Sequence, residues 1–265
     1  KFDNTVCAHN TTTELTDFTC FSHNSLKRIA KALNNKYEKI KYNLNDKKIL
    51  WEQIKDNLSN KCGNNEVCWI EQSPIKNIND EQIDEYTFKP LIPKKKYEWL
   101  KTSDINNVMT QFQKLIDNFL FLGTVPIDFD DIFSEFKKFN VKMLMSNNIK
   151  KIGVVFNLDP HYKSGSHWVA LFSEFPYTVE YFDSYGDAND NNGYPPNEIE
   201  IFMDRIANQF VKIGGGKNKN NIKLYNKTRH QYANSECGVY SLNFLIERLK
   251  GKTFENITNS VVKDE

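Results

Sequence analysis

One cysteine of the chain lies where a thiol can be activated for nucleophilic attack. Cys237 opens an amphipathic segment that runs to about Lys250 and is followed by Gly251. The N-terminus of such a helix offers unpaired N–H groups and a partial positive charge, and both favour the thiolate form. A small buried residue with no chemical role is an equally common alternative for an isolated free cysteine. The surrounding residues must therefore decide between the two interpretations.

A histidine and an acid lie at the ends of two successive predicted strands. His167 precedes the apolar run that begins at Trp168, and Asp183 follows the run that begins at Thr178. If the two strands are adjacent and antiparallel, both side chains lie at the same end of the sheet. A carboxylate there can hold the imidazole in one tautomer and stabilise an imidazolium opposite a thiolate. With Cys237, these residues would form the catalytic group of a cysteine hydrolase.

Two other histidines compete with His167 for this role. His161 lies within a predicted loop, and His230 directly precedes Gln231. Neither shows an acid at an equivalent strand end, so we place both behind His167. Taken singly, His167 could be a surface histidine and Asp183 a turn-forming residue, and only their combination with a cysteine indicates catalysis.

Two residues close to Cys237 could serve the transition state and the substrate. Attack on an amide carbonyl leaves an oxyanion, and the backbone N–H of Cys237 and the side-chain NH₂ of Gln231 are candidate donors. Each such donor is typically worth about 100- to 1,000-fold in rate. Gly238 lacks a Cβ, so a substrate backbone could approach the nucleophile closely. A glutamine in a polar loop is usually only solvated, and its neighbours give Gln231 its meaning.

The periodicity of apolar residues predicts the elements that must position these groups. Spacing typical of one helix face occurs at about 24–34, 46–58, 103–119, 128–138, 197–212 and 237–250. Short apolar runs rich in β-branched and aromatic residues predict strands at about 152–158, 168–172, 178–182 and 222–225. Three successive strands with short connections predict a mostly antiparallel sheet. The fold class is therefore α+β, with a central sheet flanked by helices.

A proline-containing stretch over residues 73–96 divides the chain. We expect a helical N-terminal extension or domain over residues 1–95 and the catalytic core over residues 96–265. The whole chain of 265 residues is long enough to bury a substantial core in one large domain or two small ones.

Composition excludes several classes of partner. The 35 Lys and Arg residues nearly balance the 34 Asp and Glu residues, which argues against a nucleic-acid partner. No apolar run is long enough to span a bilayer, and the first residues show no secretory pattern, so we expect no membrane partner. Five cysteines, an odd number, do not indicate a disulfide framework. We therefore expect a reducing compartment, which also suits a working thiolate.

The remaining cysteines, with nearby histidines, are candidate zinc ligands, because thiolate and imidazole are the ligands that zinc prefers. The candidates are Cys7, His9, Cys20, His23, Cys62 and Cys68. Their spacings match none of the tight zinc signatures, and cysteines packed in helices are the commoner outcome. We predict no metal at the catalytic site and no cofactor.

The order of the site residues resembles that of the adenain/Ulp-SENP-like cysteine peptidases. The pattern consists of His167-Trp168, Asp183, Gln231 and Cys237-Gly238. The segment from Trp99 is similar to the W-L-x-D-x-x-I entry of that family, and the resemblance covers about residues 96–250.

This resemblance implies an adenain/Ulp-like protease core with a defined role for each site residue. Cys237 would be the nucleophile, His167 the general base and acid, Asp183 its orienting acid and Gln231 an oxyanion donor. Trp168 would flank a narrow groove that admits a pair of small P2–P1 residues, often Gly-Gly. The implied partner is a polypeptide substrate.

The N-terminal third differs from the deconjugating enzymes and is closer to the polyprotein-processing proteases of large DNA viruses, of the African swine fever virus type. That resemblance implies maturation of viral capsid or structural polyproteins, in the host cytoplasm at the viral factory, in the virion, or in both. The alternatives are a SUMO- or ubiquitin-like deconjugating protease and an inactive binding scaffold with the same fold. The intact set of Cys237, His167, Asp183 and Gln231 argues against the scaffold.

Overall fold

The computed structural model describes residues 7–8, 18–36, 41–78, 83, 87–89, 98–215 and 218–261. The chain divides into two compact units, residues 1–91 and residues 92–265. The boundary expected between residues 95 and 96 lies outside the described residues.

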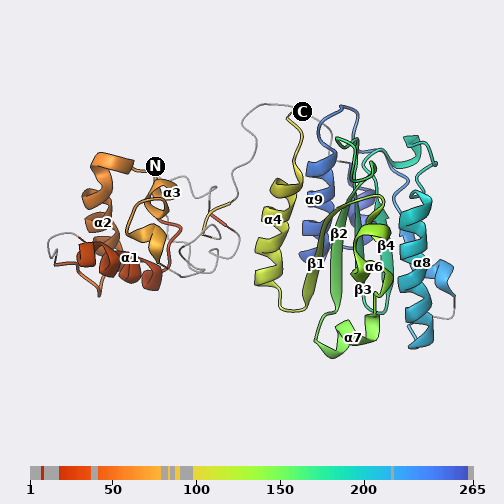
Figure 1. Cartoon of the computed structure of the whole chain (residues 1–265), viewed down its shortest axis with the longest axis horizontal. Coiled ribbons are helices and arrows are strands. Elements are labelled where there is room, and N and C mark those ends of the chain that lie inside the picture. The colour runs from red at the N-terminus through yellow and green to blue at the C-terminus, as the bar shows by residue number, and fades with distance from the viewer. Residues whose placement is uncertain are drawn as a thin grey trace. The chain divides into compact units, whose positions relative to one another are not determined.

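The N-terminal unit is helical in its described part. It contains α1 (His23–Lys36), α2 (Lys47–Cys62), α3 (Glu66–Ile70) and a 3-10 turn at Ile75–Asn77 (Figure 1). The helices predicted at 24–34 and 46–58 are confirmed, and each is slightly longer than the pattern indicated. The carboxylate of Asp46 starts α2 because it accepts from the backbone N–H groups of Lys48 and Ile49. The apolar faces pack around Trp69, which is fully buried.

Two disulfides lie in this unit, and they contradict the expectation of unpaired cysteines in a reducing setting. Cys7 is bonded to Cys20 and Cys62 to Cys68, with Cα–Cα distances of 5.3 and 5.5 Å. Four of the five cysteines form these two disulfides, and the fifth, Cys237, is free. The pairing also removes the thiolates that the zinc alternative needs. Among the described residues, no group of three or more His, Cys, Asp or Glu side chains could hold a metal ion.

The second unit is built on a five-stranded sheet. Its strands follow the chain order: β1 (Phe119–Pro126), β2 (Lys151–Asn157), β3 (Trp168–Glu174), β4 (Thr178–Phe182) and β5 (Lys223–Tyr225). The two central pairings, β2–β3 and β3–β4, are antiparallel. Both edge pairings, β1–β2 and β4–β5, are parallel, which the sequence did not indicate. The α+β class itself is confirmed.

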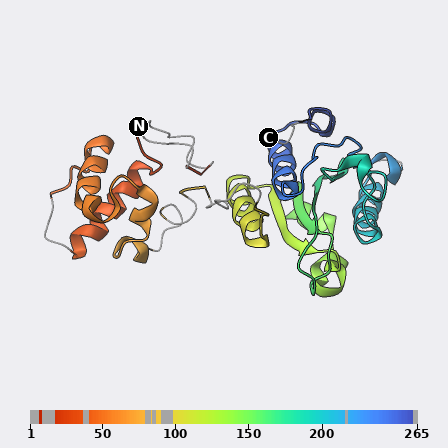
Figure 2. The same cartoon turned by 90° about the horizontal axis from the view of Figure 1, so that it is seen from above.

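Helices cover both faces of this sheet (Figures 1 and 2). One layer consists of α4 (Thr102–Leu115), α9 (Cys237–Leu249) and α10 (Phe254–Thr258). The other consists of α5 (Phe129–Ile132), α6 (Ser134–Lys137), α7 (Val141–Ser146) and α8 (Asn197–Lys212). The prediction of α8 and of a helix that begins at Cys237 is confirmed, whereas the single helix predicted at 128–138 is two short ones. Among the described helices, none is long and apolar enough to cross a membrane.

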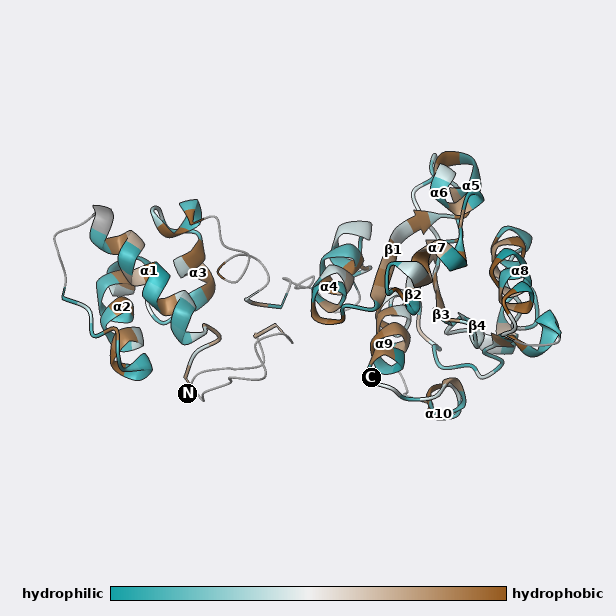
Figure 3. Cartoon of the chain, turned by 90° about the horizontal axis from the view of Figure 1, so that it is seen from below, coloured by the Kyte–Doolittle hydropathy of each residue, from teal (hydrophilic) through white to brown (hydrophobic). Residues whose placement is uncertain are grey.

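Alternating side chains join the sheet to both helical layers. In β2, Val154 and Phe156 enter the core shared with α8, and Val155 enters the core shared with α9. Figure 3 shows the helices with both brown and teal residues, as expected for helices that are apolar on one side only. The sheet is therefore buried on both faces, and the candidate catalytic residues His167 and Asp183 lie at the ends of its strands.

Strand β1 corrects the predicted helix at 103–119, because α4 ends at Leu115. The side chains of α4 complete the outer edge of this strand. The backbone N–H of Thr124 donates to Asn106 Oδ1 at 3.0 Å, and that of Phe121 donates to Gln113 Oε1 at 2.7 Å. These two side chains take the place of a neighbouring strand, so the edge is closed to further pairing.

Candidate active site

The register of β3 and β4 places the histidine and the acid side by side. Ala170 pairs with Phe182, so the residue before β3 and the residue after β4 lie at the same end of the sheet. His167 Nε2 and Asp183 Oδ1 are 2.7 Å apart there. The juxtaposition predicted from the two strand ends is confirmed.

The Asp183 carboxylate is held by more than the histidine. It is buried, and it also accepts from the backbone N–H of Tyr185 at 2.9 Å and from Asn189 Nδ2 at 2.9 Å. The Tyr185 ring stacks on the His167 ring with 4.6 Å between centroids. Sequence reasoning missed Tyr185 and Asn189, although both follow soon after the strand-end acid. Together these contacts fix the direction in which the carboxylate and imidazole face each other.

Cys237 is the free cysteine of the chain, and it begins α9. Its side chain interacts with His167 and contributes to the raised pKa of that imidazole. Because Asp183 occupies Nε2, the Nδ1 atom of the imidazole is left for the thiol. The side chain is almost fully buried, with 1% of the residue exposed. The structure thus brings together the three residues that the sequence proposed as a catalytic group.

The charges around His167 favour its protonated form. Burial by itself would lower its pKa, but the hydrogen bonds and charges of Asp183 and Cys237 raise the pKa of His167 to about 9. Burial and the negative charges of Cys237 and Asp183 also raise the pKa of Tyr185. An imidazolium that persists at neutral pH is suited to stabilise a thiolate beside it.

Gln231 is fully buried, and its side-chain amide is held from two sides. Ser184 Oγ donates to Gln231 Oε1 at 2.7 Å, and Gln231 Nε2 donates to the carbonyl oxygen of Ala233 at 2.8 Å. The amide nitrogen carries two hydrogens, so one N–H is left for another acceptor. The Tyr240 hydroxyl, on the first turn of α9, donates to the His230 carbonyl at 3.2 Å. The loop that carries Gln231 is thereby attached to the helix of Cys237.

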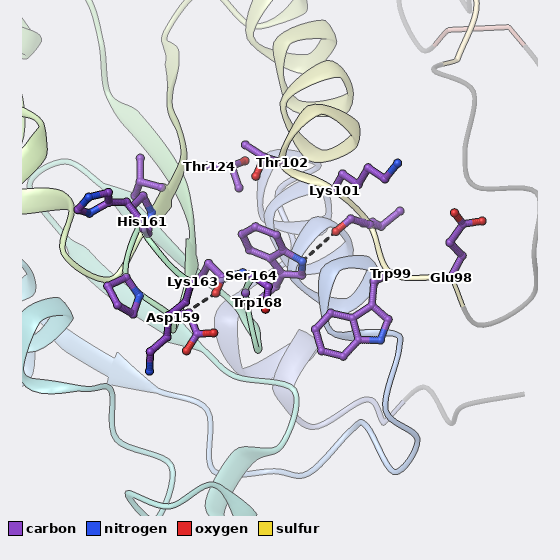
Figure 4. A pocket seen from close by; sticks show the side chains of 16 residues that line it. Glu98, Trp99, Lys101, Thr102, Thr124, Asp159, His161, Lys163, Ser164 and Trp168 are labelled. Carbon is purple, nitrogen blue, oxygen red and sulfur yellow. Dashed lines mark hydrogen bonds between the residues drawn. The ribbon is translucent and has the colours of Figure 1, made fainter.

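Trp168 and Gly238 pack against each other. Trp168 Nε1 donates to the Leu100 carbonyl at 3.0 Å, as the dashed line in Figure 4 shows. A Cβ at Gly238 would lie 3.1 Å from Leu100 Cβ and 3.2 Å from Trp168 Cδ1. Gly238 therefore admits these two side chains of the protein itself. The expected close approach of a substrate backbone at Gly238 stays a prediction.

A pocket of about 600 Å³ adjoins Trp168 (Figure 4). Its wall includes charged side chains of both signs together with an exposed tryptophan; among them are Trp99, Lys101, Asp159, His161 and Lys163. Thr124 also lines the pocket, and its Oγ1 is buried without a hydrogen-bond partner in the described part of the chain. The pocket thus offers both apolar and polar contacts beside Trp168, although Cys237, His167 and Asp183 are not part of its wall.

The two competing histidines have other surroundings. His161 does have an acid, since its Nδ1 lies 2.6 Å from Asp128 Oδ2, but His161 belongs to the pocket wall and its side chain is 59% exposed. The sequence had indicated no acid at an equivalent strand end for His161. His230 is buried against Phe182 and Tyr240, and this burial lowers its pKa. His230 is therefore a core residue.

Comparison with known proteins identifies relatives of this chain. No family model matches the chain. A protein of Acanthamoeba polyphaga mimivirus that is named as a thiol protease is 35% identical over 262 residues, which cover 91% of this chain and 84% of that protein. A SUMO-1 cysteine protease of African swine fever virus is 32% identical over 118 residues, 43% of this chain and 39% of the viral enzyme.

The solved structures agree on the fold. The crystal structure of the African swine fever virus pS273R protease matches with a TM-score of 0.65 and 21% sequence identity, over 100% of this chain and 92% of that one. The mimivirus relative is similar over most of its own length, and the group of residues around Cys237 supplies the thiol that such an enzyme needs. The chain therefore belongs to this family of viral thiol proteases, as the order of its site residues predicted, and it is a cysteine protease.

Proposed function

We propose that this cysteine protease is an endopeptidase that cleaves after small residues, at sites of the Gly-Gly-X type, and matures viral structural polyproteins. One observation carries the proposal: the free thiol of Cys237 lies at a helix N-terminus beside the hydrogen-bonded pair of His167 and Asp183. The other four cysteines are oxidised, so no other thiol of the chain can act as nucleophile.

The proposed roles follow from this geometry. The Cys237 thiolate attacks the scissile carbonyl carbon, and the C–N bond breaks when the His167 imidazolium gives its proton to the leaving amine. The neutral imidazole then takes a proton from water, which attacks the thioester and releases the new carboxyl terminus and the thiol. Asp183 holds the imidazole by its Nε2 and stabilises each imidazolium that forms.

The oxyanion of each tetrahedral intermediate needs donors that are already in place. The backbone N–H of Cys237, at the start of α9, is one, and the remaining N–H of Gln231 Nε2 is the other. Neither requires rearrangement of the loop, since Gln231 is bonded on both sides of its amide.

The packing around the nucleophile supports small residues next to the scissile bond. Cys237 is 1% exposed and Trp168 is 6% exposed. Trp168 is fixed by its hydrogen bond to Leu100, and both pack on Gly238. A bulky side chain at P1 or P2 would have to displace the packed side chains of Trp168 and Leu100, whereas a glycine at these positions has no side chain to accommodate.

The pocket beside Trp168 would receive the substrate residues that precede the small pair. Trp168 forms part of the pocket wall, so a substrate chain that passes Trp168 would enter the pocket next. Lys101, Lys163 and Asp159 offer charges of both signs, and Thr124 Oγ1 offers a donor or acceptor without a partner of its own in the described structure. Such a lining suits a polar, extended peptide segment.

A second candidate function is the removal of SUMO- or ubiquitin-like proteins. The name of the African swine fever virus relatives as SUMO-1 cysteine proteases favours it.

The site of action that we propose is the viral factory in the host cytoplasm, the virion, or both. The two disulfides favour the virion, because disulfides persist in oxidising surroundings.

A cleavage assay distinguishes these functions. The wild-type protein is incubated with a library of Gly-Gly-X peptides, with Cys237→Ala as control, and separately with vinyl-sulfone probes made from SUMO or ubiquitin. We expect turnover of the peptides by the wild type alone. Labelling of Cys237 by the protein probes without cleavage of any peptide would favour deconjugation, and cleavage by Cys237→Ala would sink the proposed mechanism.

A further inference from the structure

Two consecutive residues at the end of β4 contact the two halves of the catalytic machinery. The Asp183 side chain bonds to His167 at 2.7 Å, and the Ser184 side chain bonds to Gln231 at 2.7 Å. Both Asp183 and Ser184 are buried, each with 1% exposure. One strand end therefore fixes the group that moves protons and the group proposed to hold the oxyanion.

Ser184 holds Gln231 at two levels. Its carbonyl oxygen accepts from the backbone N–H groups of His230 and Gln231, at 2.8 and 2.9 Å. Its hydroxyl donates to Gln231 Oε1, at the far end of the same residue. The backbone contact positions the loop, and the hydroxyl contact orients the side-chain amide within it.

The orientation of that amide decides whether it can donate. In the observed orientation Nε2 donates one hydrogen to the Ala233 carbonyl and keeps the other. Loss of the Ser184 hydroxyl would leave Oε1 of Gln231 as a buried acceptor with no partner from Ser184, and a buried unsatisfied oxygen favours rotation toward a new donor. Rotation would change the direction of the second N–H, which is the one proposed to donate to the oxyanion.

We propose that Ser184 is a positioning residue for catalysis, whose hydroxyl keeps the Gln231 amide in the donating orientation that an oxyanion requires. This inference rests on the proposed role of Gln231. Ser184 acts through Gln231 alone, and it leaves the thiolate–imidazolium pair to Asp183.

The test combines Ser184→Ala with Gln231→Ala in a double-mutant cycle. We expect Ser184→Ala to lower kcat on a cleaved peptide about tenfold with KM unchanged, which is less than the about 100- to 1,000-fold loss from removing the donor itself. In the Gln231→Ala background, Ser184→Ala should change kcat less than about twofold, because the residue through which it acts is gone. A similar tenfold loss in both backgrounds, or no loss in the wild-type background, would overturn the proposal.

Alkylation of Cys237 by iodoacetamide separates this role from an effect on the catalytic pair. The reaction needs the thiolate but forms no oxyanion, so Ser184→Ala should leave its rate and pH profile unchanged. A shift of that profile would mean that Ser184 acts through Asp183 and would contradict the proposal. Ser173→Ala is the matched control, since Ser173 on β3 is also buried and its hydroxyl donates to the Thr178 carbonyl at 2.6 Å. It should preserve kcat.

A second variant guards against a folding defect. If Ser184→Ala melts far below Ser173→Ala, Ser184→Cys keeps the approximate size and replaces the hydroxyl by a weak donor, and we expect a comparable loss of kcat. Unchanged kcat in Ser184→Cys would count against the proposal. Every kcat can be measured on any peptide that the enzyme cuts, because an oxyanion forms at every amide. Failure of Gly-Gly specificity would therefore be seen in the wild type and leaves this test intact.

Discussion

The two units of the chain treat their cysteines in opposite ways. The N-terminal unit contains four cysteines, and all are paired in disulfides. The catalytic unit contains one, Cys237, which is free and lies beside His167. The smaller unit has its cysteines in disulfide cross-links, while the larger unit has a free thiol as its candidate nucleophile.

The sizes of the cores explain this division. In its described part the N-terminal unit packs three helices around one cluster that contains Trp69, and small units often need covalent links to stay folded. The catalytic unit has helical layers on both faces of a five-stranded sheet and two apolar cores. A core of this size does not need a disulfide to stay folded. The unit contains no second cysteine, so the Cys237 thiol cannot be lost to a disulfide within it.

Removal of the catalytic thiol should produce the largest effect. Cys237→Ala should lower kcat by at least about 10,000-fold, because the nucleophile has no substitute. Peptide cleavage monitored over days gives the residual rate. The matched control is the double variant Cys62→Ser/Cys68→Ser, which removes sulfur from the other unit and should retain near wild-type kcat. An equal loss of kcat in Cys237→Ala and in the double variant would contradict the distinction between structural and catalytic cysteines.

Loss of the orienting acid should give the next largest effect and a change in pH dependence. Asp183→Asn should lower kcat at least about 100-fold, since the amide neither carries the charge nor fixes the tautomer. In the wild type, kcat/KM should fall as the pH rises through about 9, where His167 loses its proton. In Asp183→Asn this falling limb should move to lower pH. A limb at the same pH in both would show that Asp183 does not set the pKa of His167.

The same shift has a consequence for stability. The pKa of His167 is raised from 6.5 to about 9 on folding, so the protonated imidazole stabilises the folded state. This contribution is fully present below about pH 6.5 and is lost as the pH rises through about 9. Thermal melts of the wild type and Asp183→Asn across this range should converge at high pH.

Reduction of the disulfides should destabilise one unit and spare the other. The Cys7–Cys20 bond joins residues 13 apart and is expected to contribute about 3 kcal/mol, and the Cys62–Cys68 bond, which joins residues 6 apart, somewhat less. Hydrogen exchange with and without dithiothreitol should show lost protection in α1 to α3 and unchanged protection in the sheet. Equal loss in β3 and α9 would show that the catalytic unit depends on these bonds.

A buried carboxylate of the N-terminal unit offers a smaller, matched perturbation. Glu66 accepts from the Cys20 backbone N–H at 3.1 Å and from Trp51 Nε1 at 2.5 Å. Glu66→Gln should cost about 1–2 kcal/mol of unfolding free energy, because an amide nitrogen cannot accept. Glu71→Gln is the control, since its ion pair with Lys76 is exposed and should be worth much less. Urea melts followed by tryptophan fluorescence measure both, and equal costs would refute the structural role of Glu66.

The sequence predicted those features that depend on local pattern. The helix from Cys237 has a regular apolar face, and the strand-end positions of His167 and Asp183 follow from two short apolar runs with a tight connection. Their contact required only that the two strands pair. The fold class and the candidate catalytic group can therefore be inferred from the sequence.

Other features depend on contacts between distant segments. Only the three residues 116–118 separate α4 from strand β1, and the outer edge of β1 is covered by α4 side chains that the pattern does not reveal. The bond between Cys7 and Cys20 depends on how the chain returns, and an odd count of cysteines concealed it. The contact of Ser184 with Gln231 joins the end of β4 to a loop 47 residues away. Neither residue type nor spacing points to such a pair.

Alkylation mapped by mass spectrometry tests the central claim most directly. The protein is treated with increasing iodoacetamide without a reducing agent, and each cysteine-containing peptide is quantified alongside the remaining peptidase activity. We predict that only Cys237 is modified and that activity falls in proportion to its modification. Full activity after complete modification of Cys237, or inactivation that tracks alkylation of another cysteine, would contradict the assignment of Cys237 as the single catalytic thiol.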